Sequence, residues 1–194
     1  EAVWFTKNVS NYNLHQSIPA ENEIIDLATP CIKMKSIKNE IELKNIEQAH
    51  IKDGVAVTKF MFWLKNTIGK ETITELSAQT ILEEYREQQE LYMGPSFDTI
   101  SAYGSNAAMM HYSASQESNA TLHTCGMLLV DSGGHYLEGS TDITRTFVLG
   151  DITDEEKKDF TCVARGMLNL SAAKFLYGCT GINLDILARG PMWN

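Results

Sequence analysis

The sequence predicts an α+β protein in which helices cover one face of a largely antiparallel sheet. Three observations support this prediction. Apolar residues recur at spacings of three and four in the first half of the chain, as in amphipathic helices. Short apolar runs separated by glycine-rich turns follow, as in β-hairpins, and a further helical pattern comes after them. This order of elements favours separate helical and sheet layers over a parallel sheet with alternating strands and helices.

Residues 1–34 differ from the rest of the chain in their pattern of predicted secondary structure. They predict a short strand at 3–5, a brief helix over 11–18 and an extended, proline-containing connector that ends near 29–31. We therefore expect residues 1–34 to be the tail of a preceding domain with its linker, and 35–194 to form the main domain. The chain begins without an initiator methionine and stops within an apparent helix and turn, so we expect a fragment at both ends.

Two helices are expected next. Asn39 can cap a helix over 39–68 whose apolar residues recur at helical spacing, and Gly54 inside it suggests a close packing contact. Thr72–Glu75 has the pattern of a capping box and opens a second helix that runs to about Gln89. One face of this second helix is predicted to be a solvated surface, formed by Glu83, Glu84, Arg86, Glu87 and Gln88.

The β-rich segment predicts two hairpins. The first would pair 97–103 with 107–112 around a Gly-Ser-Asn turn, and the second would pair 125–131 with 142–149 across a glycine-rich turn. A capping box at Thr153 and Glu156 then opens a helix over 154–176, and a last helix begins at 183. These elements complete the predicted sheet and its helical layer.

Composition excludes several classes of function. The chain has 194 residues, 43% of them hydrophobic and 21% charged, with a net charge of −9. Its basic residues are scattered, so we expect no nucleic-acid partner. No apolar run approaches the ~20 residues that span a bilayer, so we expect no membrane partner. Four cysteines without regular spacing indicate reduced thiols, and we expect a cytoplasmic protein.

The second hairpin carries two aspartates, Asp131 and Asp142, one on each strand. If the hairpin folds about Tyr136 and Leu137, the two face each other with Cβ atoms roughly 4.5–5.5 Å apart. Like charges this close oppose ionisation, and divalent cations would relieve the repulsion. The residues alone leave open whether the pair binds metal or caps an exposed turn.

The segments 131–133 and 139–146 closely resemble the metal-binding segment of aminopeptidase P, one of the pita-bread (creatinase-like) metallopeptidases. Further stretches are similar: 38–40, 49–56, 96–101 and 111–112. The resemblance covers the chain from about residue 33 to its end. It implies the N-terminal half of a pita-bread fold, with 35–194 as a truncated N-terminal part of the catalytic domain.

The resemblance also implies roles for individual residues. Asp131 would chelate one metal ion and Asp142 would bridge two. His111 would line the active site near the substrate or leaving group, although a lone histidine judged without the family is more often structural. Thr144 shares a strand face with Asp142 and would hydrogen-bond a metal ligand.

The cofactors implied are two divalent metal ions, manganese first, with zinc or cobalt as alternatives. The family uses two aspartates, one histidine and two glutamates as ligands, and the last three have no counterpart in this chain. We therefore expect the chain to be inactive alone. A lone half of the fold would also expose a large apolar patch and self-associate.

The implied activity is removal of the N-terminal residue from peptides with proline in second position, by a protein that forms a homodimer at full length. Prolidase and methionine aminopeptidase of the same fold are alternatives. So is a non-catalytic pita-bread binding module, but the members without activity are degenerate at the metal positions, whereas Asp131, Asp142 and His111 are present here.

Overall fold

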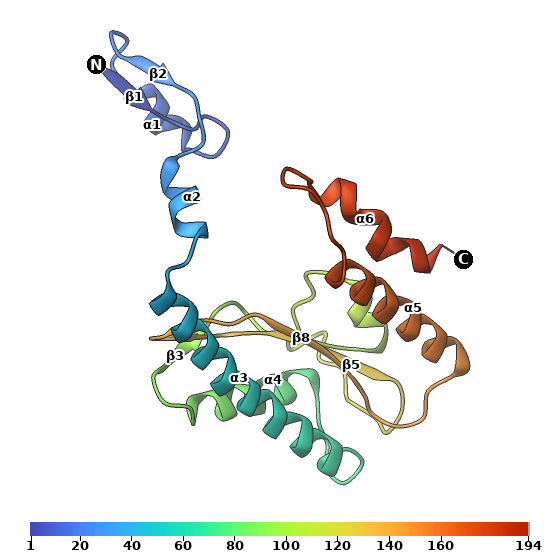
Figure 1. Cartoon of the computed structure of the whole chain (residues 1–194). Helices are drawn as coiled ribbons and strands as arrows, with labels where there is room; N and C mark the ends of the chain where they lie inside the picture. The colour runs from blue at the N-terminus through green and yellow to red at the C-terminus, as the bar shows by residue number, and fades with distance from the viewer. Residues whose placement is uncertain (194) are drawn as a thin grey trace.

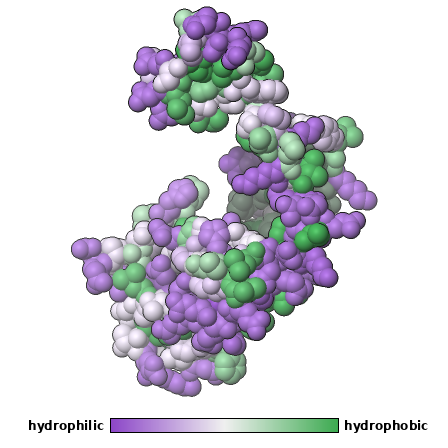
Figure 2. Space-filling view, turned by 90° about the vertical axis from the view of Figure 1, so that its left-hand side faces the viewer, coloured by the Kyte–Doolittle hydropathy of each residue, from purple (hydrophilic) through white to green (hydrophobic). Residues whose placement is uncertain are grey.

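The computed structural model describes residues 1–193 and begins with a small separate unit. Strand β1 (Ala2–Trp4) pairs in parallel with β2 (Glu23–Ile25), helix α1 (Tyr12–Gln16) lies between them in sequence, and α2 (Pro30–Ser36) leads onward. This unit lies at the far end of α2 (Figure 1) and stands clear of the main body in the space-filling view (Figure 2). The predicted strand and helix are confirmed.

The predicted extended segment ends where expected, near residues 29–31, but strand β2 within it and helix α2 after it were not predicted. Pro30 begins that helix, where a proline is tolerated because the first N–H groups of a helix have no partner within it. Helix α2 spans the expected domain boundary near residue 34, so the division at 34 and 35 remains a prediction.

The two long helices form as predicted. Helix α3 (Glu40–Thr67) is capped by Asn39, whose side chain accepts hydrogen bonds from the N–H groups of Ile41 and Glu42. Helix α4 (Glu75–Glu87) is capped by Thr74 in a box with Ser77, two residues later than the predicted Thr72–Glu75 box. The expected close contact at Gly54 is wrong, since no atom of residues 1–193, apart from the neighbouring helix backbone, lies within 4 Å of a Cβ placed there.

The strands of the main body are short and all antiparallel. They are β3 (Tyr92–Pro95), β4 (Ile100–Tyr103), β5 (Met127–Ser132), β6 (Gly134–Tyr136), β7 (Gly139–Ser140) and β8 (Ile143–Val148). Their neighbour orders are β4-β5-β8 and β3-β6-β7. The predicted antiparallel sheet is confirmed.

The core lies between this sheet and the helices α3 and α4. Leu128 and Phe147 are buried on the helix-facing side, and the Phe60 and Phe147 rings meet edge to face with centroids 5.7 Å apart. Because side chains alternate along a strand, Leu129 and Asp131 point to the opposite face. One face of the sheet is thus covered by α3 and α4, and the other carries the aspartates.

The predicted first hairpin does not form. After β4 the chain enters a short 3₁₀ helix, η1 (Gly104–Ala108), and β4 pairs with β5 instead of with residues 107–112. The cause is a tertiary contact: the buried carboxylate of Glu75 accepts hydrogen bonds from the Tyr103 N–H at 2.7 Å and the Asn106 side chain at 2.9 Å. These bonds turn the chain where a second strand would start.

Glu75 is the centre of this part of the fold. It is fully buried at the start of α4 and also accepts from the Tyr112 hydroxyl at 2.6 Å and the Ala120 N–H at 3.0 Å. Burial alone would raise the pKa of Glu75, but the bonds from Tyr112, Asn106 and the backbone together lower it. The carboxylate therefore stays ionised and holds the 104–120 loop to α4.

Helices α5 (Asp154–Ser171) and α6 (Gly181–Arg189) follow, with the short 3₁₀ helix η2 (Gly190–Met192) after them. In Figure 1 they lie on the side of the sheet away from α3 and α4. The Thr153 capping box of α5 is confirmed, although the helix ends five residues before position 176. In the described residues 1–193, no helix combines the length and apolar character needed to cross a bilayer.

The hydrogen bonds accepted by the buried Glu75 carboxylate lead to a first prediction. Glu75→Gln should lower the free energy of unfolding at neutral pH by about 2–3 kcal/mol, because an amide nitrogen would face donors that now bind a carboxylate. The folded-state pKa of Glu75 is lowered, so its contribution is present above the ordinary glutamate pKa and is lost as pH falls through the folded value. Urea denaturation of the unsubstituted chain and of Glu75→Gln should show that their difference in free energy of unfolding becomes smaller at acid pH. Glu84→Gln, at an exposed position of the same helix, is the control and should change little.

The second prediction concerns α5, α6 and the loop between them, whose large apolar side chains are widely exposed. They include Val163, Met167, Phe175, Leu176, Ile182 and Ile186, with exposed fractions of 55% to 89%. The chain alone should self-associate as its concentration rises, because such a surface is costly in water. Light scattering over a concentration series measures this, and a monomer throughout would contradict it.

Candidate functional site

The two aspartates lie on one long hairpin. Its register is continuous: Met127 pairs with Val148 at the open end, Ser132 with Ile143 in the middle, and Tyr136 with Gly139 next to the tip. The tip is therefore formed by residues 137 and 138, one position later than predicted.

This register corrects the expected pairing of the aspartates. Asp131 lies opposite Thr144, and the same register extended towards the tip places Asp142 two pairs further on, opposite Gly133. The two aspartates are therefore diagonal neighbours, for which Cα separations of roughly 7–8 Å are usual.

Both carboxylates nevertheless belong to the same face of the hairpin. Thr144 shares the face of Asp131, and Asp142 comes two residues before Thr144, so alternation returns it to that face. The Thr144 hydroxyl donates a hydrogen bond to Asp131 Oδ1 at 2.7 Å. Asp131 is half-buried and Asp142 is exposed. Asp131 and Thr144 are thus in contact, and the register places Asp142 on the same face, on the side away from α3 and α4.

The pair suits a hard divalent cation. Carboxylate oxygens are the ligands that such ions prefer, and among residues 1–193 no lysine or arginine forms an ion pair with either aspartate. Within the same range, no three His, Cys, Asp or Glu side chains gather closely enough to hold a metal ion. The described chain therefore offers part of a ligand set.

His111 is not joined to the carboxylates by any such cluster. It is exposed in the loop after η1, and the strand expected to carry it does not form. Its neighbour Tyr112 is buried and donates to Glu75, so the loop is tied to α4 next to His111. The role of His111 stays a prediction.

The sequence interpretation missed a buried charge network behind the aspartates. Arg86, predicted to lie on a solvated face, is fully buried, and its Nε donates to Asp53 Oδ1 at 2.6 Å. The helical spacing in the sequence could have identified both Asp53 and Arg86 as buried. Asp53 falls in the buried helical register of Ala49 and Ala56, and Arg86 follows Leu82 by one turn.

The Asp53 carboxylate also binds the hairpin. It accepts from the Thr141 hydroxyl at 2.8 Å and from the Tyr136 hydroxyl at 3.2 Å, while Arg86 Nη2 donates to Ser132 Oγ at 3.0 Å. Burial and the charge of Asp53 raise the pKa of Tyr136 well above its usual range, so its hydroxyl remains a donor.

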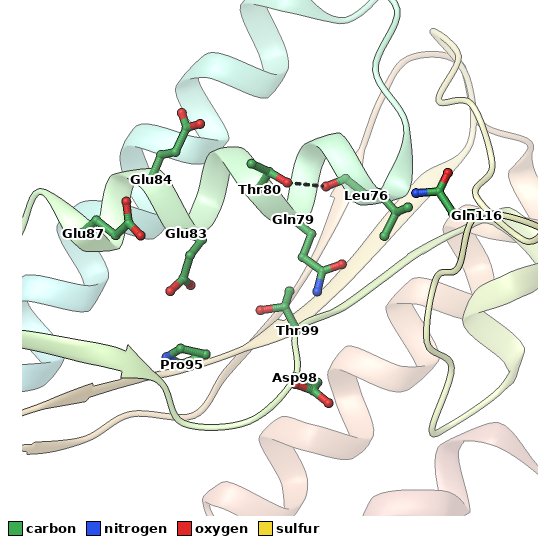
Figure 3. A pocket seen from close by; sticks show the side chains of 10 residues that line it. All are labelled: Leu76, Gln79, Thr80, Glu83, Glu84, Glu87, Pro95, Asp98, Thr99 and Gln116. Carbon is green, nitrogen blue, oxygen red and sulfur yellow. Dashed lines mark hydrogen bonds between the residues drawn. The ribbon is translucent and has the colours of Figure 1, made fainter.

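A groove of about 710 Å³ lies elsewhere, between the outer side of α4 and the segment before β4. Its acidic lining includes Glu83, Glu87 and Asp98 (Figure 3). Neither Asp131, Asp142 nor any other predicted site residue lines it. The hollow is therefore separate from the candidate metal site.

Comparisons with known proteins agree with the fold. The model of metallopeptidase family M24 matches residues 44–194. A probable Xaa-Pro aminopeptidase P of Aspergillus niger is 39% identical over 188 residues, which cover 96% of this chain and 31% of that protein.

Solved structures give the same result. The X-prolyl aminopeptidase of Caenorhabditis elegans, a cytosolic enzyme with a di-nuclear active site, matches with a TM-score of 0.89 and 32% identity over 99% of this chain and 31% of its own. The X-Pro aminopeptidase of Thermotoga maritima matches with a TM-score of 0.75 and 25% identity, over 100% of this chain and 53% of its own.

The chain spans about a third of the length of the aminopeptidase P relatives that it matches. The predicted pita-bread fold is confirmed by these neighbours. With most of its length matched by the family model, the chain belongs to metallopeptidase family M24.

Proposed function

We propose that this chain works as part of a longer dinuclear aminopeptidase that removes the N-terminal residue from peptides with proline in second position. The single observation that carries the proposal is the placement of Asp131 and Asp142 on one face of a hairpin, without a basic partner among the described residues. The likeness to Xaa-Pro aminopeptidases over nearly the whole chain supports the substrate class.

Each predicted site residue has a role in this proposal. Asp131 and Asp142 would hold the divalent ions, Asp131 as a ligand of one and Asp142 as a ligand shared by both. Thr144 fixes the orientation of the Asp131 carboxylate through its hydrogen bond, and His111 lies near the substrate or leaving group. When bound, the metal ions supply Lewis-acid polarisation of the scissile carbonyl and lower the pKa of water. Manganese suits oxygen ligands, with zinc and cobalt as alternatives.

The chain offers too few ligands to act alone. Two carboxylates without a third nearby donor should bind a divalent ion weakly, because affinity depends on a full and oriented ligand shell. In this proposal the remaining ligands come from a part of the longer protein outside these 194 residues. A cytoplasmic location and a homodimer at full length belong to the same proposal; the Caenorhabditis elegans relative is cytosolic.

The activity test compares the longer protein with the 194-residue chain on an Xaa-Pro-Yaa peptide with added Mn²⁺. The longer protein should turn over, and the chain alone should not. Asp131→Asn and Asp142→Asn should each lower kcat/KM by about a hundredfold or more, because each removes a charged ligand. Asp159→Asn, at an exposed position of α5, is the matched control and should keep full activity.

Several outcomes would contradict the proposal. Full-rate turnover by the 194-residue chain would show that the site is complete without other residues. Hydrolysis of Xaa-Pro dipeptides alone would favour a prolidase, and cleavage of Met-Ala-Ser peptides would favour a methionine aminopeptidase. A longer protein without any turnover would favour a binding module.

A separate prediction concerns Thr144. Thr144→Val keeps the shape of the side chain but removes its hydrogen bond to Asp131, and should weaken Mn²⁺ binding by the longer protein about tenfold. Thr146→Val is the control, because Thr146 lies on the same strand face and makes no bond to Asp131. Titration calorimetry would measure both. Equal losses in the two variants would argue against an orienting role for Thr144.

A further inference from the structure

The face of the hairpin that points towards α3 and α4 carries three hydroxyl groups that converge on one buried ion pair. Asp53 and Arg86 are both fully buried. The hydroxyls are those of Ser132, Tyr136 and Thr141, each no more than 6% exposed. A buried carboxylate and a buried guanidinium are thus bound to both strands of the hairpin.

Two of these hydroxyls belong to the immediate neighbours of the aspartates. Ser132 follows Asp131 on one strand, and Thr141 precedes Asp142 on the other. Because side chains alternate between faces, anchoring Ser132 and Thr141 on the helix side directs the two carboxylates to the opposite side. The Asp53 carboxylate binds Thr141 directly and Ser132 through Arg86.

We propose that the buried Asp53–Arg86 pair is a positioning element that sets the relative placement of the Asp131 and Asp142 carboxylates from the reverse face of the hairpin. The inference rests on the proposed metal-binding function of those carboxylates. Among the described residues, neither Asp53 nor Arg86 forms a hydrogen bond or ion pair with Asp131 or Asp142, so the pair acts through the residues next to them, Ser132 and Thr141.

The energetics of buried ion pairs favour this role over a purely stabilising one. Removing two charges from water carries a large free-energy cost, and well-packed apolar residues often stabilise a core equally well. Apolar contacts, however, are not directional and do not fix the position of one strand relative to a helix as hydrogen bonds do. The bonds from Arg86 and Thr141 are directional, and they fix where each strand lies along the helices.

The strand connections next to the aspartates add to this restraint. The Ser96 hydroxyl donates to the Thr141 carbonyl at 2.8 Å, and the Ser96 N–H donates to the Gly133 carbonyl at 3.0 Å. The Gly134 N–H donates to the Thr141 hydroxyl at 2.9 Å. The backbone on either side of the carboxylates is therefore held at several points.

The experiment measures Mn²⁺ binding by the metal-free longer protein, using titration calorimetry together with urea denaturation. Thr141→Val removes the hydroxyl and should weaken Mn²⁺ binding about tenfold, whereas Thr141→Ser keeps the hydroxyl and should restore it. Ser132→Ala removes only the bond from Arg86 and should weaken binding in the same direction. It serves as the second test where the valine variant does not fold.

Ser101→Ala is the matched control. Ser101 is also a fully buried serine on the helix-facing side of the sheet, but its hydroxyl has no hydrogen-bond partner among the described residues. Its removal should leave Mn²⁺ affinity unchanged. This comparison separates loss of a buried hydroxyl in general from loss of the anchor.

The outcomes distinguish the inference from the function on which it rests. If Thr141→Val and Ser132→Ala lower stability while Mn²⁺ affinity stays at the unsubstituted value, the pair is structural only and the inference is overturned. If the unsubstituted longer protein binds no Mn²⁺, the proposed function fails and the inference fails with it. Weakened binding in both variants, with rescue by Thr141→Ser, supports the inference.

Discussion

The ion pair between Asp53 and Arg86 is the interaction on which the rest of the main body depends. A charge in a dry interior is costly unless it is paired, and neither side chain reaches water. Of the polar side-chain atoms of this pair, only Arg86 Nη1 lacks a hydrogen-bond partner among the described residues. The compensation comes from two helices and from both strands of one hairpin, so these elements can pack in only one mutual register. The helices that make the core and the hairpin that carries the aspartates are therefore subject to one common constraint.

The two faces of the hairpin carry different kinds of side chain. On its helix-facing side, Leu128 and Phe147 supply apolar contact and Ser132 and Thr141 supply hydrogen bonds. Its other face carries the carboxylates. Since the side-chain period of a strand is two, a slip of one residue would bury Asp131 in the core, which makes the register costly to change.

Elements that depend on local sequence were predicted well, and those that depend on distant contacts were not. The caps at Asn39 and Thr153 and the antiparallel pairing of β5 with β8 follow from neighbouring residues. The strand expected over 107–112 failed because Glu75, far away in sequence, turns the chain. Arg86 was assigned to the surface because charge outweighed its helical register. The hairpin tip was placed one residue early, which shifts the partner of Asp142 by two residues, from Asp131 to Gly133.

Gly133, which lies opposite Asp142 in the hairpin, approaches the neighbouring strand too closely to carry a side chain. A Cβ there would lie 2.0 Å from the Thr141 carbonyl oxygen, so the two backbones touch where the acidic residues face each other diagonally. Main-chain contact, and not side-chain packing, thus sets how near the strands come. An ion of larger or smaller radius would meet the same opening, and discrimination between ions would have to come from other donors that complete the coordination sphere.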